Sequence, residues 1–228
     1  MPELDWRHAK APERKPIDGE AVRLEPLDAE RHSDDLFAAA AGADATWHYL
    51  PYGPFPSRSA FGAWLQRHAA TMDPLAFAII DREAGAARGI ATFMSIVPEH
   101  GVIEIGHIWL SPPLQRTRQA TEAIFLMSRH AFDVLGNRRL EWKCDAANEA
   151  SRRAAERFGF VFEGVFRQHR VVKARNRDTA WYSILDSEWP SRRAAFEAWL
   201  SPENFDAQGR QLRSLAQVRS GIETYRSG

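Results

Sequence analysis

Residues 102–123, with the sequence VIEIGHIWLSPPLQRTRQATEA, decide the fold of this chain. An apolar strand ends at Leu110, a proline turn follows, and a helix begins at about Thr117, flanked by Arg116 and Arg118. The N-terminus of a helix presents unpaired backbone N–H groups and a partial positive charge, so this junction is suited to hold a phosphate. A plain strand-turn-helix connection with solvated arginines is the alternative.

The rest of the chain alternates strands and helices around this junction. Apolar runs bounded by turn residues predict strands at 21–27, 75–80, 89–97, 102–110, 139–144, 160–172 and 179–185. Helical spacing, with Asp28, Ser57 and Asn148 as N-caps, predicts helices at 28–42, 57–71, 117–135, 148–158, 189–200 and 208–225. The strands between 75 and 110 are expected to form an antiparallel meander, and those between 160 and 185 a hairpin. Because strands and helices interleave, we expect an α/β fold on a mixed sheet.

Composition limits the classes of partner. The 228 residues carry 30 basic and 30 acidic side chains, so the net charge of zero argues against nucleic-acid binding driven by bulk charge. Residues 148–178 nevertheless hold eight basic and four acidic side chains, so an anionic ligand can find positive charge there. Glycine loops of the GxGxxG and Walker types and the GxSxG elbow do not occur.

The location and the parts of the chain follow from the same inspection. Cys144, the one cysteine, can form no internal disulfide and lacks a second thiolate for structural zinc, and residues 1–18 lack the apolar stretch of a secretory signal. We therefore expect a cytoplasmic protein with no metal and no membrane or nucleic-acid partner. We expect a polar extension over residues 1–20, one α/β domain over 21–190 and a helical appendage over 191–228, which could form a homodimer contact.

The junction resembles the phosphate-cradling motif of the GNAT superfamily of N-acyltransferases. That motif is Gln or Arg, two residues, Gly, one residue, then Gly or Ala; Gln115 and Ala120 match its ends, and Arg118 stands at its glycine. Glu104-Ile105-Gly106, Thr121-Glu122-Ala123, and Asn148 with Gly159-Phe160 look like the branch that contains the ribosomal-protein alanine acetyltransferases. The resemblance extends from about residue 22 to 189 and includes the order of the elements.

The resemblance implies how the chain binds its co-substrate, acetyl-CoA. In that family a mostly antiparallel sheet, flanked by helices, splays apart between the motif strand and the next one, and the pantetheine arm enters there. Carried over to this chain, the resemblance implies that the strand over residues 102–110 offers backbone groups to the pantetheine arm and that residues 115–120 hold the diphosphate. Asn148 would form a hydrogen bond with the arm, in addition to capping the following helix or in place of it. The implied CoA-binding residues are Ile108, Trp109, Leu110, Gln115, Arg116, Thr117, Arg118, Gln119, Ala120, Thr121 and Asn148.

Acyl transfer to an amine requires a base, because amines are mostly protonated at neutral pH. Glu104 is the first candidate, since it lies eleven positions before Gln115, where family members with a carboxylate base carry it. Its apolar neighbours predict a raised pKa. His107 is the second candidate because its ordinary pKa suits proton transfer. The alternatives are that Glu104 faces solvent and that His107 has a structural role. Many relatives carry a tyrosine that acts as the general acid at the position of Ala155, so no general acid is assigned in this chain.

The acceptor site in this superfamily is built by the first two helices and the late hairpin. The matching residues that we select for substrate binding are Trp47, Tyr49, Tyr52, Arg167 and His169. Aromatic rings can sandwich an acceptor and arginines can hold a carboxylate, although the aromatic loop could instead close the core. We expect an enzyme that moves an acetyl group from acetyl-CoA to a primary amine of a small molecule, an amino-acid derivative or a protein N-terminus. The alternatives are a longer donor such as succinyl-CoA, a silent CoA-binding sensor and a structural dimerisation module.

Overall fold

One mixed sheet organises the part of the chain that the structure, a computed structural model, describes, which is residues 5–227. Its strands, in the order β1-β2-β3-β4-β5-β6-β8-β7, are β1 (Ile17–Asp18), β2 (Val22–Pro26), β3 (Leu75–Asp81), β4 (Ala86–Val97), β5 (Val102–Leu110), β6 (Arg139–Asp145), β8 (Arg175–Leu185) and β7 (Val161–Val172). Every neighbouring pair is antiparallel except β5 with β6. The predicted meander, the hairpin and the mixed sheet are confirmed.

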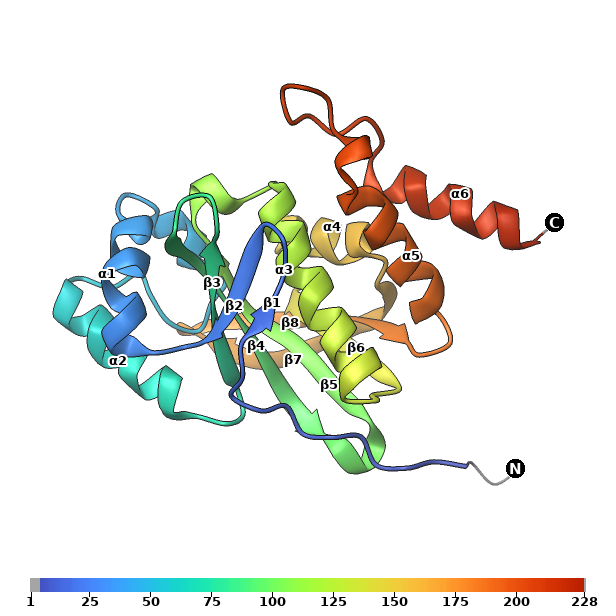
Figure 1. Cartoon of the computed structure of the whole chain (residues 1–228). Coiled ribbons are helices and arrows are strands. Elements are labelled where there is room, and N and C mark those ends of the chain that lie inside the picture. Colours follow the sequence, from blue (N-terminus) through green and yellow to red (C-terminus); the bar gives the residue numbers. More distant parts are fainter. Residues whose placement is uncertain (1–4, 228) are drawn as a thin grey trace.

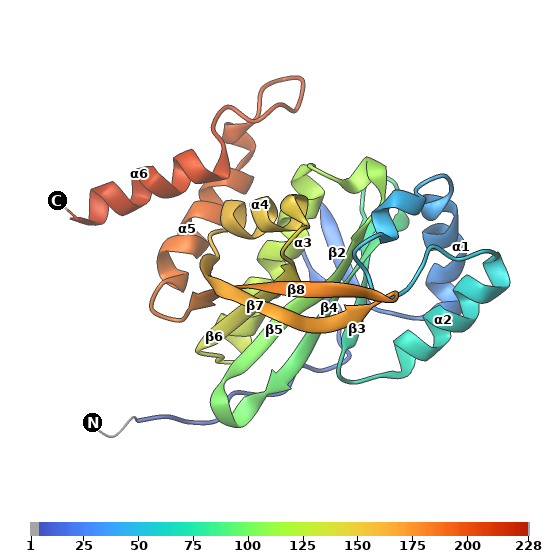
Figure 2. The same cartoon turned by 180° about the vertical axis from the view of Figure 1, so that it is seen from behind.

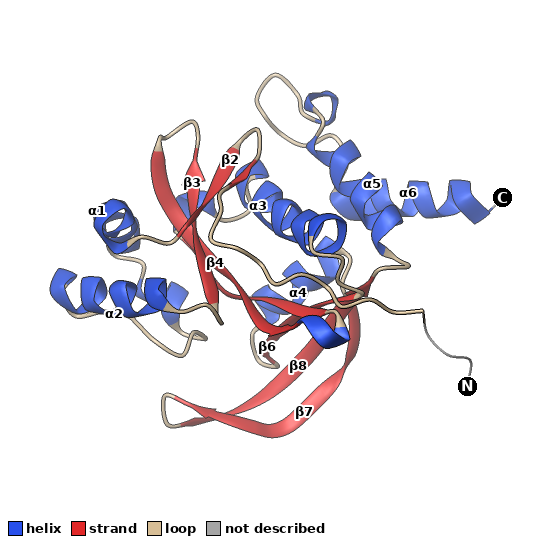
Figure 3. Cartoon of the chain, turned by 60° about the horizontal axis from the view of Figure 1, so that its bottom comes forward, coloured by secondary structure: helices blue, strands red, loops and turns tan. Residues whose placement is uncertain are grey.

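Helices cover both faces of the sheet (Figure 1 and Figure 3). They are α1 (Ala29–Ala40), α2 (Arg58–Ala70), α3 (Arg118–Arg129), α4 (Glu149–Phe158), α5 (Trp189–Leu200) and α6 (Leu215–Ser227). The buried residues form two clusters, one including Leu36 of α1 and Phe61 of α2, the other including Ile124 of α3 and Phe196 of α5. Each face of the sheet therefore has its own core, as an α/β fold requires.

The predicted caps begin these helices. Asp28 accepts hydrogen bonds from the N–H groups of the first turn of α1, Ser57 accepts one from Ala60, and Asn148 accepts one from Ser151. Gly159, at φ 94°, ends α4 in the left-handed conformation that glycine adopts without strain. Local sequence thus determines where α1, α2 and α4 begin and where α4 ends.

The predicted elements differ from the observed ones in several places. Two strands begin earlier than predicted, β4 at Ala86 and not at residue 89, and β8 at Arg175 and not at residue 179. The helix expected over 117–135 changes to a π-helical turn over His130–Val134. The last helix begins at Leu215 and not at residue 208, because the Asp206 carboxylate accepts the N–H groups of Gln208 and Arg210 and holds that segment in a turn. The two-residue strand β1 was not predicted, since its partner β2 and not its own sequence makes it a strand.

The strands β5 and β6 separate after a short common stretch (Figure 2). They pair in parallel at Val102 with Arg139, Ile103 with Leu140, and Glu104 with Glu141, and at no later position in the described chain. β5 nevertheless continues to Leu110 and β6 to Asp145. A bulge in β5, with His107 at φ 48° and a register shift against β4, adds to the divergence. The predicted splay after the motif strand is confirmed.

The C-terminal helices pack on α3 and α4. Phe196 and Trp199 of α5 and Val218 of α6 are buried in the same core as α3. Arginine side chains reinforce the contact, since Arg192 donates to the carbonyl of Gly159 and Arg219 to that of Arg157. The division at residues 20 and 190 remains a prediction. None of the helices within residues 5–227 combines the length and apolar character that a membrane span requires.

Candidate active site

The junction between β5 and α3 leaves backbone donors unpaired. Thr117 caps α3 by accepting the Ala120 N–H, and Arg116 takes a left-handed conformation at φ 62°. Within residues 5–227, the N–H groups of Arg116, Thr117, Arg118 and Gln119 donate no hydrogen bond. Four adjacent free donors at the positive end of a helix suit an anion such as a diphosphate.

Other side chains of this motif have partners of their own. Gln115 Nε2 donates to the Leu110 carbonyl at 3.0 Å, so it fixes the end of β5. Thr121 is buried, donates to the Thr117 carbonyl and accepts from Arg157. Ala120 is also buried and uses its N–H in the cap. These three side chains shape the junction, and its free backbone groups are what a ligand can reach.

The Arg118 guanidinium, which stands at the motif's glycine, is held by the C-terminal region. Its Nη2 donates to the Leu200 carbonyl at 2.7 Å and lies 3.3 Å from the Glu20 carboxylate. The guanidinium also lies over the Phe205 ring, at 5.4 Å from its centroid. We therefore retain Arg118 as a candidate CoA-binding residue through its backbone N–H and not through its side chain.

Glu104 lies at the last paired position before the strands diverge. It is 4% exposed, and its Oε2 accepts from Ser95 Oγ at 3.0 Å and from Lys143 Nζ at 2.9 Å. Its Oε1 accepts no hydrogen bond from the described residues and lies beside Gly106, where a Cβ would come within 3.2 Å of it. Burial raises the pKa of Glu104, while Lys143 and Ser95 partly oppose that rise. One carboxylate oxygen is therefore fixed and the other is available.

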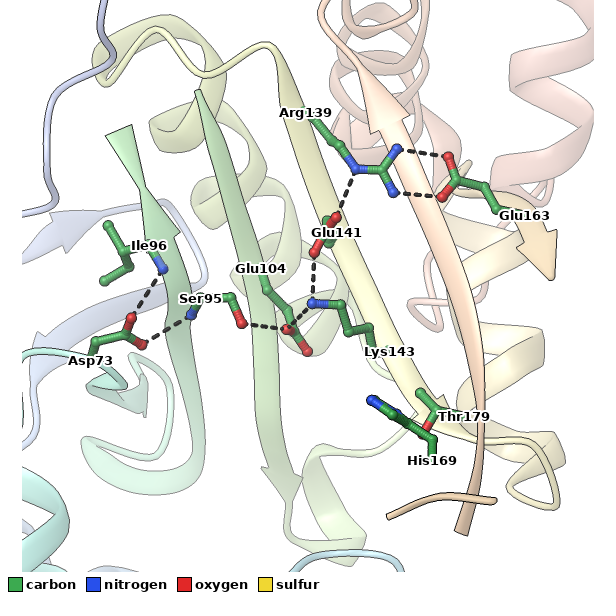
Figure 4. Close-up of polar contacts among 10 residues, drawn as sticks. All are labelled: Asp73, Ser95, Ile96, Glu104, Arg139, Glu141, Lys143, Glu163, His169 and Thr179. Atoms are coloured by element: carbon green, nitrogen blue, oxygen red, sulfur yellow. Dashed lines mark hydrogen bonds and ion pairs between the residues drawn. The ribbon is translucent and has the colours of Figure 1, made fainter. Parts of the chain in front are cut away.

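A line of polar contacts positions Glu104 across four strands (Figure 4). Lys143 Nζ also lies 2.6 Å from Glu141, which accepts from Arg139, and Arg139 in turn pairs with Glu163 on β7. On the other side, Asp73 accepts the N–H groups of Ser95 and Ile96 and holds the β4 bulge, where Ser95 has φ 49°. The carboxylate is thus fixed from both neighbouring strands.

His107 packs among aromatic rings on the α2 side of the sheet. Its ring centroid lies 5.5 Å from that of Tyr52 and 5.8 Å from that of His68. Burial lowers the pKa of both histidines to about 4, and for His107 the charges of Arg177 and Arg170 act in the same direction. Both rings are therefore neutral at pH 7, so His107 carries no ionisable proton for acid catalysis there.

The aromatic loop over residues 46–56 both fills the core and borders the divergence. Trp47 is 1% exposed and stacks on Trp109 with ring centroids 4.8 Å apart, so its side chain closes the core, as the alternative reading of this loop allowed. Tyr49 donates its hydroxyl to the Ala147 carbonyl beyond the end of β6, and Lys173 at the hairpin tip donates to the Trp47 carbonyl. The loop therefore bridges from β5 to the far side of the divergence.

The remaining predicted residues lie on the hairpin and on α4. Arg167 and His169 line an open surface depression of about 920 Å³, and His169 Nδ1 lies 2.9 Å from Thr179 Oγ1. Asn148 caps α4 through Oδ1, and its Nδ2 donates no hydrogen bond to the described residues, so capping leaves a donor for a ligand. Ala155 is buried in the core. Residues 5–227 contain no group of three or more His, Cys, Asp or Glu side chains that could hold a metal ion.

Sequence reasoning missed the residues that support Glu104 and border the divergence. Ser95, Lys143 and His68 carry no motif, because their partners are distant in sequence and depend on the register of β4 and β6 and on the docking of α2. One sequence pattern could have indicated Lys143, namely the alternation Glu141, Trp142, Lys143. In a strand this alternation places both charged side chains on one face of β6, and Glu104 of β5 lies on the same face of the sheet.

Comparison with known proteins agrees with this geometry. The sequence profile of the acetyltransferase (GNAT) domain matches residues 21–161. A GCN5-related N-acetyltransferase from Brucella melitensis is 51% identical and superposes with a TM-score of 0.93, over 95% of this chain and 99% of that one. A probable GNAT-family acetyltransferase from Chromobacterium violaceum is 49% identical with a TM-score of 0.78, over 83% and 96%.

A more distant relative has a name that refers to ribosomal acetylation. The Bacillus subtilis (strain 168) protein YdaF, whose name gives ribosomal N-acetyltransferase as a provisional activity, is 26% identical over 170 residues, which are 73% of this chain and 90% of that one. The matched domain covers the diverging strands β5 and β6, Glu104 and the phosphate-type junction together. The chain therefore belongs to the GNAT family of acetyltransferases and is an N-acetyltransferase.

Proposed function

We propose that the protein transfers an acetyl group from acetyl-CoA to a primary amine, with Glu104 as the base. The observation that supports this most strongly is the separation of β5 from β6 directly after Glu104, at the strand that leads into the junction with free N–H groups. Acetyl-CoA supplies the activated thioester. The chain's part is to bind both reactants, orient them and accept the amine proton.

The donor is proposed to lie along the unpaired edge of β5. Beyond Glu104, the β6 side of Ile108, Trp109 and Leu110 has no strand partner, so backbone groups there can bond the amide groups of a pantetheine arm. The junction over residues 115–120 then lies at the diphosphate end, and Asn148 faces the arm from the other side. Positioning of this kind is worth several powers of ten in rate.

Donor binding is tested by calorimetry and thermal unfolding with acetyl-CoA. At 100 times its dissociation constant, acetyl-CoA should raise the free energy of unfolding by about 2.7 kcal/mol. Acetyl-pantetheine, which lacks the diphosphate, should bind more weakly because it cannot use the free N–H groups of the junction. Equal affinity for the two donors would remove the proposed role of residues 115–120, and no binding of either would remove the donor site.

Glu104 is proposed to receive the proton through Oε1. Its Oε2 is fixed by Ser95 and Lys143, so the carboxylate keeps one orientation, and burial strengthens its basicity. The base must be ionised to act, so the rate should fall as pH decreases through its raised pKa. His107, neutral at pH 7, is the second proposed catalytic residue and can orient the incoming amine by hydrogen bonding.

Replacing Lys143 with methionine should move the acidic limb of the kcat/KM profile to higher pH. Lys143 lowers the pKa of Glu104 by its charge and its hydrogen bond, while Glu141 raises it, so removing Lys143 leaves Glu104 protonated up to a higher pH. The profile is measured from pH 5 to 9 and expressed per neutral amine, so that the limb reports the enzyme and not the substrate, and the thermal midpoint of the variant is measured alongside. Arg153→Met, on the exposed face of α4, serves as the control and should keep the wild-type limb. An unshifted limb in a folded Lys143→Met protein would contradict the assignment of Glu104.

A further inference from the structure

Buried polar atoms without a partner gather where β5 and β6 diverge. Eight side-chain nitrogen or oxygen atoms in the described residues are buried and lack a hydrogen bond, and five of them belong to this region. The five are Tyr52 Oη, His68 Nε2, His107 Nδ1, Arg177 Nε and Trp181 Nε1. An unmade hydrogen bond at a buried group costs about 1–3 kcal/mol, so such a cluster is unusual unless a ligand satisfies it.

Three of the five groups lie together, and the other two come from β8, which pairs with β6 on the far side of the divergence. The Tyr52, His68 and His107 rings lie within 5.5–5.8 Å of one another, centroid to centroid. From β8, Trp181 lies under Lys143, whose Nζ is 4.3 Å from its ring centroid. The Lys143 ammonium already forms ion pairs with Glu104 and Glu141, so its positive charge is compensated and is not available to bind a further anion.

Arg177 is the half-buried member of a pair of arginines at this edge of the site, since its cross-strand neighbour Arg170 is exposed. Arg177 is half-buried on β8, two residues before Thr179, which pairs with Asp145 at the end of β6. Its side chain makes no hydrogen bond or ion pair with the described residues. Its charge reaches both His107 and Glu104, since it lowers the pKa of the histidine and is itself influenced by the carboxylate. Burial lowers the pKa of Arg177, and the charges of Asp145 and Glu104 oppose this fall only in part because neither carboxylate forms an ion pair with it.

The hydrogen-bonding character of the cluster selects the ligand. Arg177 Nε and Trp181 Nε1 can only donate, and the Tyr52 hydroxyl can donate as well. Because both histidines are neutral, each ring also offers one accepting nitrogen. The matching molecule has oxygen acceptors with negative charge at one end and a nitrogen donor at the other. An unpaired, half-buried guanidinium favours a carboxylate over an uncharged amide.

We propose that the acceptor is a small amino acid, whose carboxylate is bound by Arg177 with Trp181 and Tyr52 and whose amine is directed toward His107 and Glu104. This inference rests on the proposed function and specifies the substrate class of the same site. Arg177 is then the specificity-determining residue. A protein N-terminus, which carries no carboxylate at that distance, is a poorer match to these groups.

The test compares amino acids with their carboxamides in pairs that differ only in charge. Glycine, β-alanine and 4-aminobutyrate are each paired with the amide, and thiol release from acetyl-CoA is expressed per neutral amine to remove differences in amine pKa. The best acid should exceed its amide by at least about tenfold in kcat/KM, and Arg177→Met should bring that ratio close to one. Arg175→Met, an exposed arginine on the same strand, should keep the wild-type ratio.

The outcomes separate this inference from the proposed function. Equal rates for acids and amides, or a preference that survives Arg177→Met, would overturn the carboxylate site while leaving acetyl transfer intact. If no amine releases thiol, the proposed function fails, and the carboxylate site is then decided by calorimetry with the same pairs. In that case tighter binding of the acids, lost in Arg177→Met, supports the site, and equal binding overturns it.

Discussion

Replacing Glu104 with glutamine is expected to lower kcat by about 10²-fold or more, because the amide cannot accept the proton that the amine must lose. Glutamine has nearly the same shape, and its Oε1 can still accept from Lys143 and Ser95, so the divergence of β5 and β6 should keep its geometry. The affinity for acetyl-CoA, measured by calorimetry, should therefore change by less than about threefold.

The pH profile gives this variant a second readout. Wild-type activity, expressed per neutral amine, should decline at low pH as Glu104 becomes protonated, and the Glu104→Gln profile expressed in the same way should lose that limb. Glu99→Gln, on the exposed turn that precedes β5, is the matched control and should retain both the rate and the limb. A Glu104→Gln enzyme with wild-type kcat at every pH would assign Glu104 a purely structural role.

Replacing Glu122 with alanine is expected to lower the free energy of unfolding by about 3 kcal/mol or more, since it leaves three backbone donors unsatisfied. The Glu122 carboxylate, 6% exposed, accepts the N–H groups of Glu20, Ala21 and Val22 at 2.7–2.9 Å. These contacts join the turn between β1 and β2 to α3. Gly19 leaves room for them, because a Cβ there would approach the carboxyl carbon of Glu122 to 2.9 Å.

Denaturant unfolding measures this loss directly. Glu122→Gln should be intermediate, because its amide keeps one accepting oxygen. Glu149→Ala removes an exposed glutamate at the start of α4 and should stay within about 0.5 kcal/mol of the wild type. If Glu122→Ala unfolds at the wild-type denaturant concentration, the three hydrogen bonds do not contribute to holding α3 against the sheet.

Local patterns predicted most of the fold. Asp28, Ser57 and Asn148 are caps whose effect is confined to the next three residues, so their sequence context was sufficient to place α1, α2 and α4. The strand pattern around the motif predicted β5, and the family resemblance supplied its separation from β6. The π turn after α3 and the strand β1 depend on tertiary packing and hydrogen bonding, which no local pattern encodes.

The candidate site was less accessible to prediction. Glu104 and His107 could be selected because they lie on the motif strand itself. Lys143 fixes the Glu104 carboxylate only through the pairing of Glu104 with Glu141, a register that the sequence does not state. The sequence analysis selected Arg167, which is exposed, and not Arg177 on the neighbouring strand, which is half-buried, because exposure depends on pairing and packing that the sequence does not state.

The most direct test of acetyl transfer at this site is a product measurement. The purified protein is incubated with acetyl-CoA labelled in the acetyl group and with the panel of primary amines, and mass spectrometry follows the label. The account predicts that the wild type forms labelled N-acetylated amine and free CoA in equal amounts. The amount of both products should be close to zero with Glu104→Gln over the same reaction time. Free CoA without acetylated amine, or the same product yield from Glu104→Gln as from the wild type, would contradict it.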